Sequence, residues 1–152
     1  MEMQYMPTLQ IEQDAALIRR ENDKMTVLTE AKLNAITPQF LVLDLQETCS
    51  FYVEKLGFRV AFIFDDFYAG VQRDGITIHL KHSDSPDPSR QFKRREDHLD
   101  AYITAEDVAA LYAEFQSRDV VFAQPLETKP WGMREFVVWD NSGYILHFGQ
   151  NA

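Results

Sequence analysis

The sequence predicts an α+β fold in which two βαβββ modules form a half-open mixed β-barrel, preceded by an N-terminal helical extension. Three observations predict it. A strand–helix–strand–strand–strand pattern occurs twice, an aspartate starts the helix in each copy, and a glycine-containing turn precedes the last strand of each copy. Because a helix covers only one face of a four-stranded sheet, two such modules can bury the other faces together and enclose a cavity.

The first copy begins with ITPQFLVLDLQETCSFYVEKLGFRV and ends with DGITIHLKH. Asp44 follows a short apolar strand and has capping spacing with Glu47. The helix is predicted from apolar residues at helical spacing, and Gly57 ends it. Three alternating apolar segments follow at 58–64, 67–73 and 76–81, and a DG turn at 74–75 joins the last two. The apolar helix positions are Leu45, Cys49, Tyr52, Val53 and Leu56.

The second copy begins with LDAYITAEDVAALYAEFQSRDVVF and ends with NSGYILHFG. Asp107 lies 63 residues after Asp44, and Thr104 stands at capping distance before it. Three alternating segments are predicted at 119–124, 133–139 and 144–149, with a DNSG turn at 140–143. The apolar helix positions are Val108, Leu111, Tyr112 and Phe115.

The domain prediction follows from these copies. Residues 1–33 are predicted to form an N-terminal extension, which is helical because TLQIEQDAALIRRENDK is amphipathic. Residues 34–150 are predicted to form the domain, with modules at 34–82 and 98–150. The composition of SDSPDPSRQFKRRED at 83–97 predicts a flexible linker. Its KRR cluster at 93–95 is interpreted as part of a solvated loop rather than a phosphate site.

Composition excludes several classes of protein. With 152 residues, 45% of them hydrophobic, the chain can bury a full core, but no apolar run reaches the length of a membrane span. The start MEMQYMPTLQIEQ lacks the pattern of a secretory signal, and a single cysteine, Cys49, suits a reducing cytoplasm. The net charge of −9 disfavours nucleic acid and anionic membranes as partners and would attract cationic ligands.

Alternation identifies the residues that face the cavity. In the segment 76–81, Ile76, Ile78 and Leu80 form the helix-facing row, which leaves His79 on the opposite face. In 144–149, the same reasoning leaves His147 opposite its apolar row. His79 and His147 each lie four residues after the turn glycine of their copy, so both are expected to face the cavity. An ordinary polar position on an outward face remains the alternative.

Other candidates lie on the same predicted face. Trp131, in a Pro-Trp-Gly loop, would cap the end of the barrel or form an aromatic wall that stacks on a planar or cationic ligand. Tyr102 shares a face with Asp100, which would then supply a counter-charge to a cation. Glu135 and Met133 alternate with core residues and point to the cavity. Cys49 sits in a helical apolar stripe and is interpreted as packing.

The pattern resembles the vicinal oxygen chelate superfamily, which includes glyoxalase I, extradiol dioxygenases, fosfomycin-resistance enzymes and bleomycin-resistance proteins. The resemblance covers about residues 36–149 and is carried by the FY of SFYVEKLGF, by DGITIHL and by the module pairing. The stretch PLETKPWGMREFVVWDNSGYILHFG looks most like the bleomycin-resistance branch, although its turn reads DNSG instead of a D-P-D-G-N-like sequence. The resemblance implies a glyoxalase-like fold and a homodimer with ligand clefts, and it leaves open whether modules pair within or between chains.

The resemblance also implies where a metal would be held in the enzymes of the superfamily. Those positions are Thr37 and Asp100, seven residues before the helix-starting aspartates, together with His79 and His147. Two imidazoles and a carboxylate suit zinc, nickel or iron. Thr37 replaces the usual His or Gln, and His147 stands where Glu is usual. His98 would substitute if the register differs by two residues.

Two functions and a structural alternative follow. The first is a bleomycin-resistance-like protein of antibiotic resistance, which sequesters a cationic or aromatic small molecule in a dimer cleft without a cofactor. The second is a metal-dependent lyase, isomerase or oxygenase that uses His79, Asp100 and His147. The third is a structural or regulatory dimer whose own side chains fill the cavity. The predicted ligand-binding residues are His79, Asp100, Tyr102, Trp131, Met133, Glu135 and His147.

Overall fold

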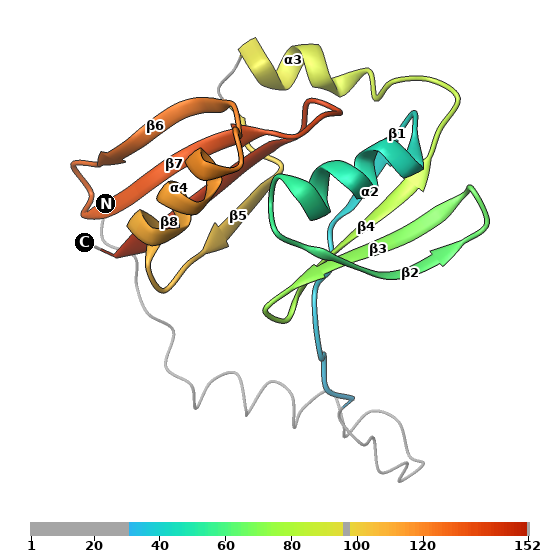
Figure 1. The fold of residues 1–152 in the computed structure, drawn as a ribbon, viewed down its shortest axis with the longest axis horizontal. Coiled ribbons are helices and arrows are strands. Elements are labelled where there is room, and N and C mark those ends of the chain that lie inside the picture. Colours follow the sequence, from blue (N-terminus) through green and yellow to red (C-terminus); the bar gives the residue numbers. More distant parts are fainter. Residues whose placement is uncertain (1–30, 96–97, 152) are drawn as a thin grey trace, which may run out of the picture. The chain divides into compact units, whose positions relative to one another are not determined.

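The computed structural model describes residues 31–95 and 98–151 of the chain. One compact unit spans Ile36–Ala152, and Figure 1 shows its elements. The helical extension predicted for residues 1–33 lies, apart from residues 31–33, outside the described residues. Among the described residues, no helix combines the length and the apolar character needed to cross a bilayer.

The first module has the predicted order of elements. These are β1 (Gln39–Val42), α2 (Leu45–Glu54), β2 (Arg59–Phe64), β3 (Tyr68–Arg73) and β4 (Ile76–His82). They form a four-stranded sheet in the order β1-β4-β3-β2, in which β1 runs parallel to β4 and the other pairs are antiparallel. Asp44 caps α2 by accepting a hydrogen bond from the backbone N–H of Glu47 at 2.8 Å.

The second module repeats this topology. It consists of β5 (Ala101–Thr104), α4 (Val108–Ser117), β6 (Phe122–Thr128), β7 (Met133–Trp139) and β8 (Ile145–Asn151). The sheet order is β5-β8-β7-β6, and Asp107 caps α4 through the backbone N–H of Ala110. The prediction of two βαβββ modules is therefore confirmed. They form two separate mixed sheets, without a closed barrel.

Two local predictions are wrong. The strand predicted at 119–124 is β6, at Phe122–Thr128, because Asp119 adopts a positive φ of 55° and Val120 packs into the core at the end of α4. Pro125 is tolerated inside β6 because β6 is an edge strand. The linker predicted as flexible contains α3 (Ser89–Arg95), whose start is held by Asp87, which accepts a hydrogen bond from the backbone N–H of Ser89 at 2.9 Å.

A single core joins the two modules on the helix side of their sheets. The phenol of Tyr52, in α2, donates a hydrogen bond of 2.8 Å to Asp140 in the β7–β8 turn. The hydroxyl of Tyr144 accepts from the backbone N–H of Leu41 and donates to its carbonyl, both at 2.8 Å. The sheet faces that point away from the helices lie opposite this core, and they carry the predicted residues His79, Tyr102, Met133, Glu135 and His147.

Candidate functional site

The faces pointing away from α2 and α4 define two surfaces, which we call the first and second open faces. The register of the strands places alternate residues on each of them. The first open face carries Gln39, Leu41, Phe62, Phe64, Tyr68, His79 and Lys81. The second open face carries Tyr102, Met133, Glu135, Val137, Trp139, Ile145 and His147.

His79 lies in an aromatic cluster on the first open face. The hydroxyl of Tyr68 lies 2.8 Å from Nδ1 of His79 and donates to the side-chain oxygen of Gln39 at 3.1 Å. Because the phenol has one proton, this arrangement favours a His79 tautomer with its proton on Nδ1. The ring of Phe62 packs edge-on against His79, at 5.4 Å between centroids. Gly70 makes room for Phe62, since a Cβ at Gly70 would meet the Phe62 ring at 2.3 Å.

A cavity of about 320 Å³ adjoins this cluster on the first open face. Phe64, Phe67, Tyr68, Gln39 and Lys81 line it. The ammonium of Lys81 lies 5.4 Å from the centroid of the Phe67 ring, within the range of a cation–π contact. This face therefore offers aromatic surface with a positive charge beside it.

On the second open face, two predicted residues meet at the carboxylate of a third, Glu135. Tyr102 donates a hydrogen bond of 2.7 Å to Oε1 of Glu135, and the indole N–H of Trp131 lies 3.5 Å from the same oxygen. Glu135 is 7% exposed, whereas Tyr102 and Trp131 are 39% and 67% exposed. Burial, together with the bond to Glu135, raises the pKa of Tyr102 to about 12. The sequence predictions that grouped Tyr102, Trp131 and Glu135 therefore coincide in space.

Close approach of the backbone at Gly149 positions Tyr102. A Cβ at this glycine would lie 1.9 Å from the Tyr102 hydroxyl, so only glycine lets the phenol lie flat across β8 toward Glu135. Trp131 is held in the β6–β7 turn, where the backbone N–H of Gly132 donates to the carbonyl of Lys129 at 3.0 Å. Met133, the first residue of β7, is half-buried on the same face as Glu135.

The two histidines occupy equivalent places in their modules. His79 is the register partner of Gln39, and His147 is the register partner of Tyr102, so each stands beside the first strand of its own sheet. The rings of Tyr102 and His147 are 6.2 Å apart between centroids. His79 and His147 thus lie on different sheets, each within an aromatic group on an open face.

The carboxylate of Asp100 is bound by Arg90 and Lys93 of α3, the helix in the predicted linker. Its carboxylate accepts hydrogen bonds of 2.6 Å from both terminal nitrogens of Arg90, 2.7 Å from Lys93 and 2.8 Å from the backbone N–H of Ile145. Burial raises the pKa of Asp100, but these donors outweigh it and lower the pKa to about 2. Arg90 also stacks on the ring of Tyr144, at 3.8 Å to the centroid. Asp100 therefore already forms ion pairs with two cations, Arg90 and Lys93, and does not fit the predicted role of counter-charge to a cationic ligand.

The implied metal ligands do not assemble. Thr37 lies two residues before β1, and Asp100 is taken by Arg90 and Lys93. Within residues 31–95 and 98–151, no three His, Cys, Asp or Glu side chains gather in a way that could hold a metal ion. Within the described residues of one chain, Asp100 therefore does not join His79 and His147 as a ligand set. The substitute position, His98, lies in contact with Phe92 of α3, at 6.0 Å between ring centroids.

Sequence reasoning missed Tyr68 and Gln39, which orient His79. The sequence contains part of the signal for Tyr68. The DG turn sets a register in which Tyr68 pairs with Lys81, and this places Tyr68 on the same face as His79. Gly70, however, interrupts the alternation of β3, and the sequence gives no sign of which aromatic ring fills the space above it.

The family model for the glyoxalase/bleomycin resistance protein/dioxygenase superfamily matches residues 32–148. The chain belongs to this superfamily, as its two βαβββ modules already indicate. No curated protein sequence gives a significant match.

Solved structures agree with this assignment. A bleomycin-binding protein from bleomycin-producing Streptomyces verticillus, complexed with copper(II)-bleomycin, is 28% identical, with a TM-score of 0.61 over 78% of this chain and 97% of that one. A bleomycin resistance determinant encoded on the transposon Tn5 is 21% identical, with a TM-score of 0.65 over 78% and 98% of the two chains. A glyoxalase-related enzyme from Clostridium phytofermentans is 18% identical, with a TM-score of 0.64 over 80% and 98%. The fold is thus shared by a bleomycin-binding protein, a bleomycin resistance determinant and a glyoxalase-related enzyme.

Proposed function

We propose that this protein binds a small cationic aromatic molecule, and that the second open face supplies the central contacts. The observation that supports this most is the carboxylate of Glu135. It is 7% exposed, and its hydrogen bonds within the described residues come from the neutral donors Tyr102 and Trp131. No lysine or arginine of residues 31–95 and 98–151 forms an ion pair with it.

A buried carboxylate is costly unless a positive charge compensates it. A ligand cation placed beside Glu135 would supply that charge. The phenol of Tyr102 and the exposed indole of Trp131 would flank the cation with aromatic faces, an arrangement that favours organic cations. The half-buried Met133 adds a flexible apolar contact at the edge of the same surface.

Binding without chemical conversion is the simplest function for such a site. Retention of a ligand at about 1 µM requires about 8 kcal/mol, which aromatic stacking, apolar burial and one desolvated ion pair can supply together. A metal-dependent reaction is not proposed, because Asp100 is already neutralised by Arg90 and Lys93. Two of the similar structures are a bleomycin-binding protein and a bleomycin resistance determinant, which makes bleomycin a rational first probe.

We further propose that two copies of the chain form the binding cleft. Phe62 and Phe64 of the first open face and Phe67 of the adjoining β2–β3 turn are 40%, 66% and 48% exposed, a large apolar surface for a protein that acts alone. A second copy that lays its second open face against this surface would bury the phenylalanines and close the cleft over Glu135.

A charge-removal experiment tests the binding proposal. Bleomycin and a simple aryl-alkyl ammonium are titrated into the wild-type chain and into Glu135→Gln, with calorimetry as the readout. Loss of an attractive charge in a partly buried site should weaken binding by roughly 30- to 1000-fold, equivalent to about 2–4 kcal/mol. Glu54→Gln, an equal charge change at the exposed end of α2, is the matched control and should leave the affinity unchanged. Equal affinity of Glu135→Gln and the wild type would remove the basis of the proposal.

Sedimentation equilibrium of the wild type and of Phe64→Glu tests the dimer. We expect a dimer for the wild type and a shift to monomer for the variant, because Phe64 is the most exposed of the three phenylalanines. A wild-type chain that stays monomeric at high micromolar concentration would contradict the dimer and leave the binding test above unaffected.

A further inference from the structure

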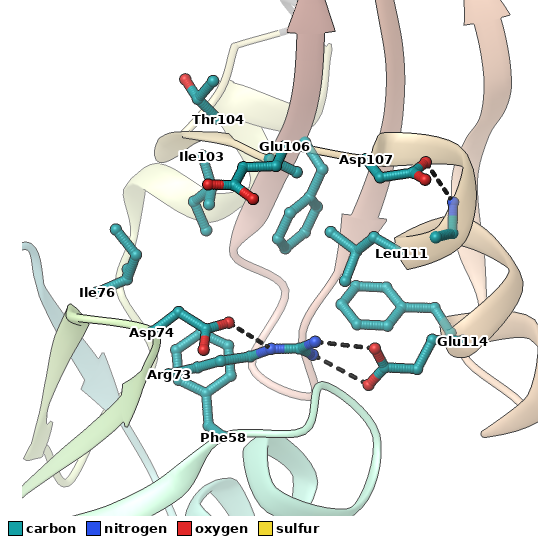
Figure 2. Close-up of a pocket in the computed structure, with 14 residues that line it drawn as sticks. Phe58, Arg73, Asp74, Ile76, Ile103, Thr104, Glu106, Asp107, Leu111 and Glu114 are labelled. Atoms are coloured by element: carbon teal, nitrogen blue, oxygen red, sulfur yellow. Dashed lines mark hydrogen bonds and ion pairs between the residues drawn. The ribbon is translucent and has the colours of Figure 1, made fainter.

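A second cavity lies on the helix side of the molecule, and none of the predicted ligand-binding residues lines it. We call it the junction pocket, because the β3–β4 hairpin of the first module and the β5–α4 segment of the second form its walls (Figure 2). Its volume is about 650 Å³, within the range of sites for drug-sized ligands. Phe115 of α4 and Phe148 of β8 contribute to its wall, which places it on the core side of the second sheet.

The floor of the junction pocket is apolar. Phe58, Ile103 and Leu111 line it, and Ile76, which is 42% exposed, stands at the edge of the hairpin. Figure 2 shows Ile76 and Asp74 on one side of the pocket and Leu111 and Glu114 on the other. A hydrocarbon or aryl group that enters the pocket would therefore contact apolar side chains from both modules.

The charge around this floor is strongly acidic. The lining includes four carboxylates, of Asp74, Glu106, Asp107 and Glu114, and one cation, Arg73. Asp107 already caps α4, and Glu114 already binds Arg73 through both oxygens, at 2.8 and 3.1 Å. This leaves Asp74 and Glu106 as the acceptors nearest to solvent.

Arg73 offers little to an anionic ligand. One of its terminal nitrogens donates to the carbonyl of Leu56 at 2.7 Å and to Glu114, the other donates to Glu114, and Nε lies 3.4 Å from Asp74. An anion would have to displace these partners and would also meet the surrounding carboxylates. A cation meets the opposite situation. Asp74 has one long ion pair, of 3.4 Å to Arg73, and its side chain is 88% exposed. Glu106 forms no ion pair within the described residues.

We propose that the junction pocket binds a small organic cation, with an apolar body on Phe58, Ile103 and Leu111 and an ammonium group between Asp74 and Glu106. This site is separate from the second open face and does not depend on the function proposed for it. A ligand held here contacts both modules and would stabilise the junction between them, since it binds the folded arrangement and not the unfolded chain.

A set of three isosteric probes tests the charge preference. 4-Phenylbutylammonium, 4-phenylbutanol and 4-phenylbutanoate are titrated into the full chain, and the methyl signals of Ile76, Ile103 and Leu111 are followed by NMR. We expect saturable shifts at these methyl groups, with the ammonium binding tightest and the carboxylate weakest. No saturable shift at millimolar ammonium, or tighter binding of the carboxylate, would overturn the proposal.

Two matched pairs of variants locate the site. Glu106→Gln should weaken ammonium binding about fivefold, the effect of one exposed charge, and Glu54→Gln should not change it. Ala110→Trp, which fills the pocket from α4, should weaken binding at least tenfold, whereas Ala113→Trp, on the same helix outside the lining, should not. Circular dichroism checks that each variant is folded.

The same probe distinguishes the junction pocket from the second open face. Glu135→Gln should leave the methyl shifts of Ile76 and Leu111 unchanged. If ammonium binding is lost in Glu135→Gln and retained in Ala110→Trp, the cation occupies the open face and the junction-pocket proposal is wrong. If ammonium binding is retained in Glu135→Gln and lost in Ala110→Trp, the junction-pocket proposal is supported, whatever the outcome for the function proposed above.

Discussion

Gly149→Ala tests the architecture of the second open face without altering any charged or aromatic side chain. The new Cβ would lie 1.9 Å from the hydroxyl and 2.7 Å from Cζ of Tyr102, far closer than two non-bonded atoms can approach. Tyr102 is 39% exposed, so its ring can rotate outward. That movement breaks the 2.7 Å hydrogen bond to Glu135 and removes one wall of the proposed cation site.

The size of the effect follows from the contacts that are lost. A hydrogen bond to a charged group contributes about 1.5–3 kcal/mol, and alanine in a strand recovers roughly 0.5–1 kcal/mol relative to glycine. We therefore expect the free energy of unfolding to fall by about 1–2 kcal/mol, with the fold preserved. Loss of a cation–π wall is equivalent to roughly 0.5–2 kcal/mol, so the affinity for a cationic aromatic probe should fall by about 2- to 30-fold.

The pKa of Tyr102 gives a readout that needs no ligand. Burial and the bond to Glu135 hold it at about 12, so the phenol should stay protonated at pH 10.5 in the wild type. In Gly149→Ala both causes weaken, and the ¹³C ring signal of Tyr102 should begin to titrate near the usual value of about 10. Gly70→Ala is the matched control, because its Cβ displaces Phe62 on the first open face and leaves Tyr102 in place. An unchanged Tyr102 titration in Gly149→Ala would refute this account of the face.

Three further predictions concern stability. Burial raises the pKa of Asp140 to about 6, so the stability that Asp140 contributes is complete below about pH 4 and is lost as the pH rises through 6. The free energy of unfolding, measured with urea between pH 4 and 7, should therefore fall by about 3 kcal/mol from this group. Asp140→Asn should abolish this fall. The pKa of Asp100 is lowered to about 2, so the stability that Asp100 contributes is present above about pH 4 and is lost as the pH falls toward 2. In Arg90→Met the free energy of unfolding at pH 7 should drop by roughly 3 kcal/mol, because Lys93 keeps only part of the ion pairing with Asp100. A drop below 0.5 kcal/mol would show that the contact between Arg90 and Asp100 is not formed in solution. Phe136→Ala should cost about 3–5 kcal/mol in the same assay, since Phe136 is fully buried, and a cost under 1 kcal/mol would argue against its place in the core.

The sequence predicts most of the fold because its signals are local and occur twice. Asp44 and Asp107 mark both helix starts, and the turn glycines set the register that places His79 and His147 on the open faces. The alternation of β7 also identifies Glu135 as facing away from the core. Each of these inferences needs only neighbouring residues along the chain.

The role of Asp100 could not be predicted in the same way. Its partners, Arg90 and Lys93, come from a segment whose Ser, Pro and charge content indicates a flexible linker. Only the tertiary fold brings α3 over the start of β5, and the ion pairs form because Asp100 and the stacked Tyr144 lie beneath it. The first open face poses a similar difficulty, since Gly70 of β3 leaves a gap that is filled by Phe62 of the neighbouring strand β2.

The most direct test of the central claim is the response of the Trp131 indole N–H to a cationic aromatic ligand in an ¹⁵N-labelled chain. Trp131 is 67% exposed and lies 3.5 Å from Oε1 of Glu135, so a cation bound there must change its surroundings. We predict a saturable shift of this signal in the wild type and its loss in Glu135→Gln. A ligand that saturates the protein while the Trp131 signal stays fixed would contradict the account.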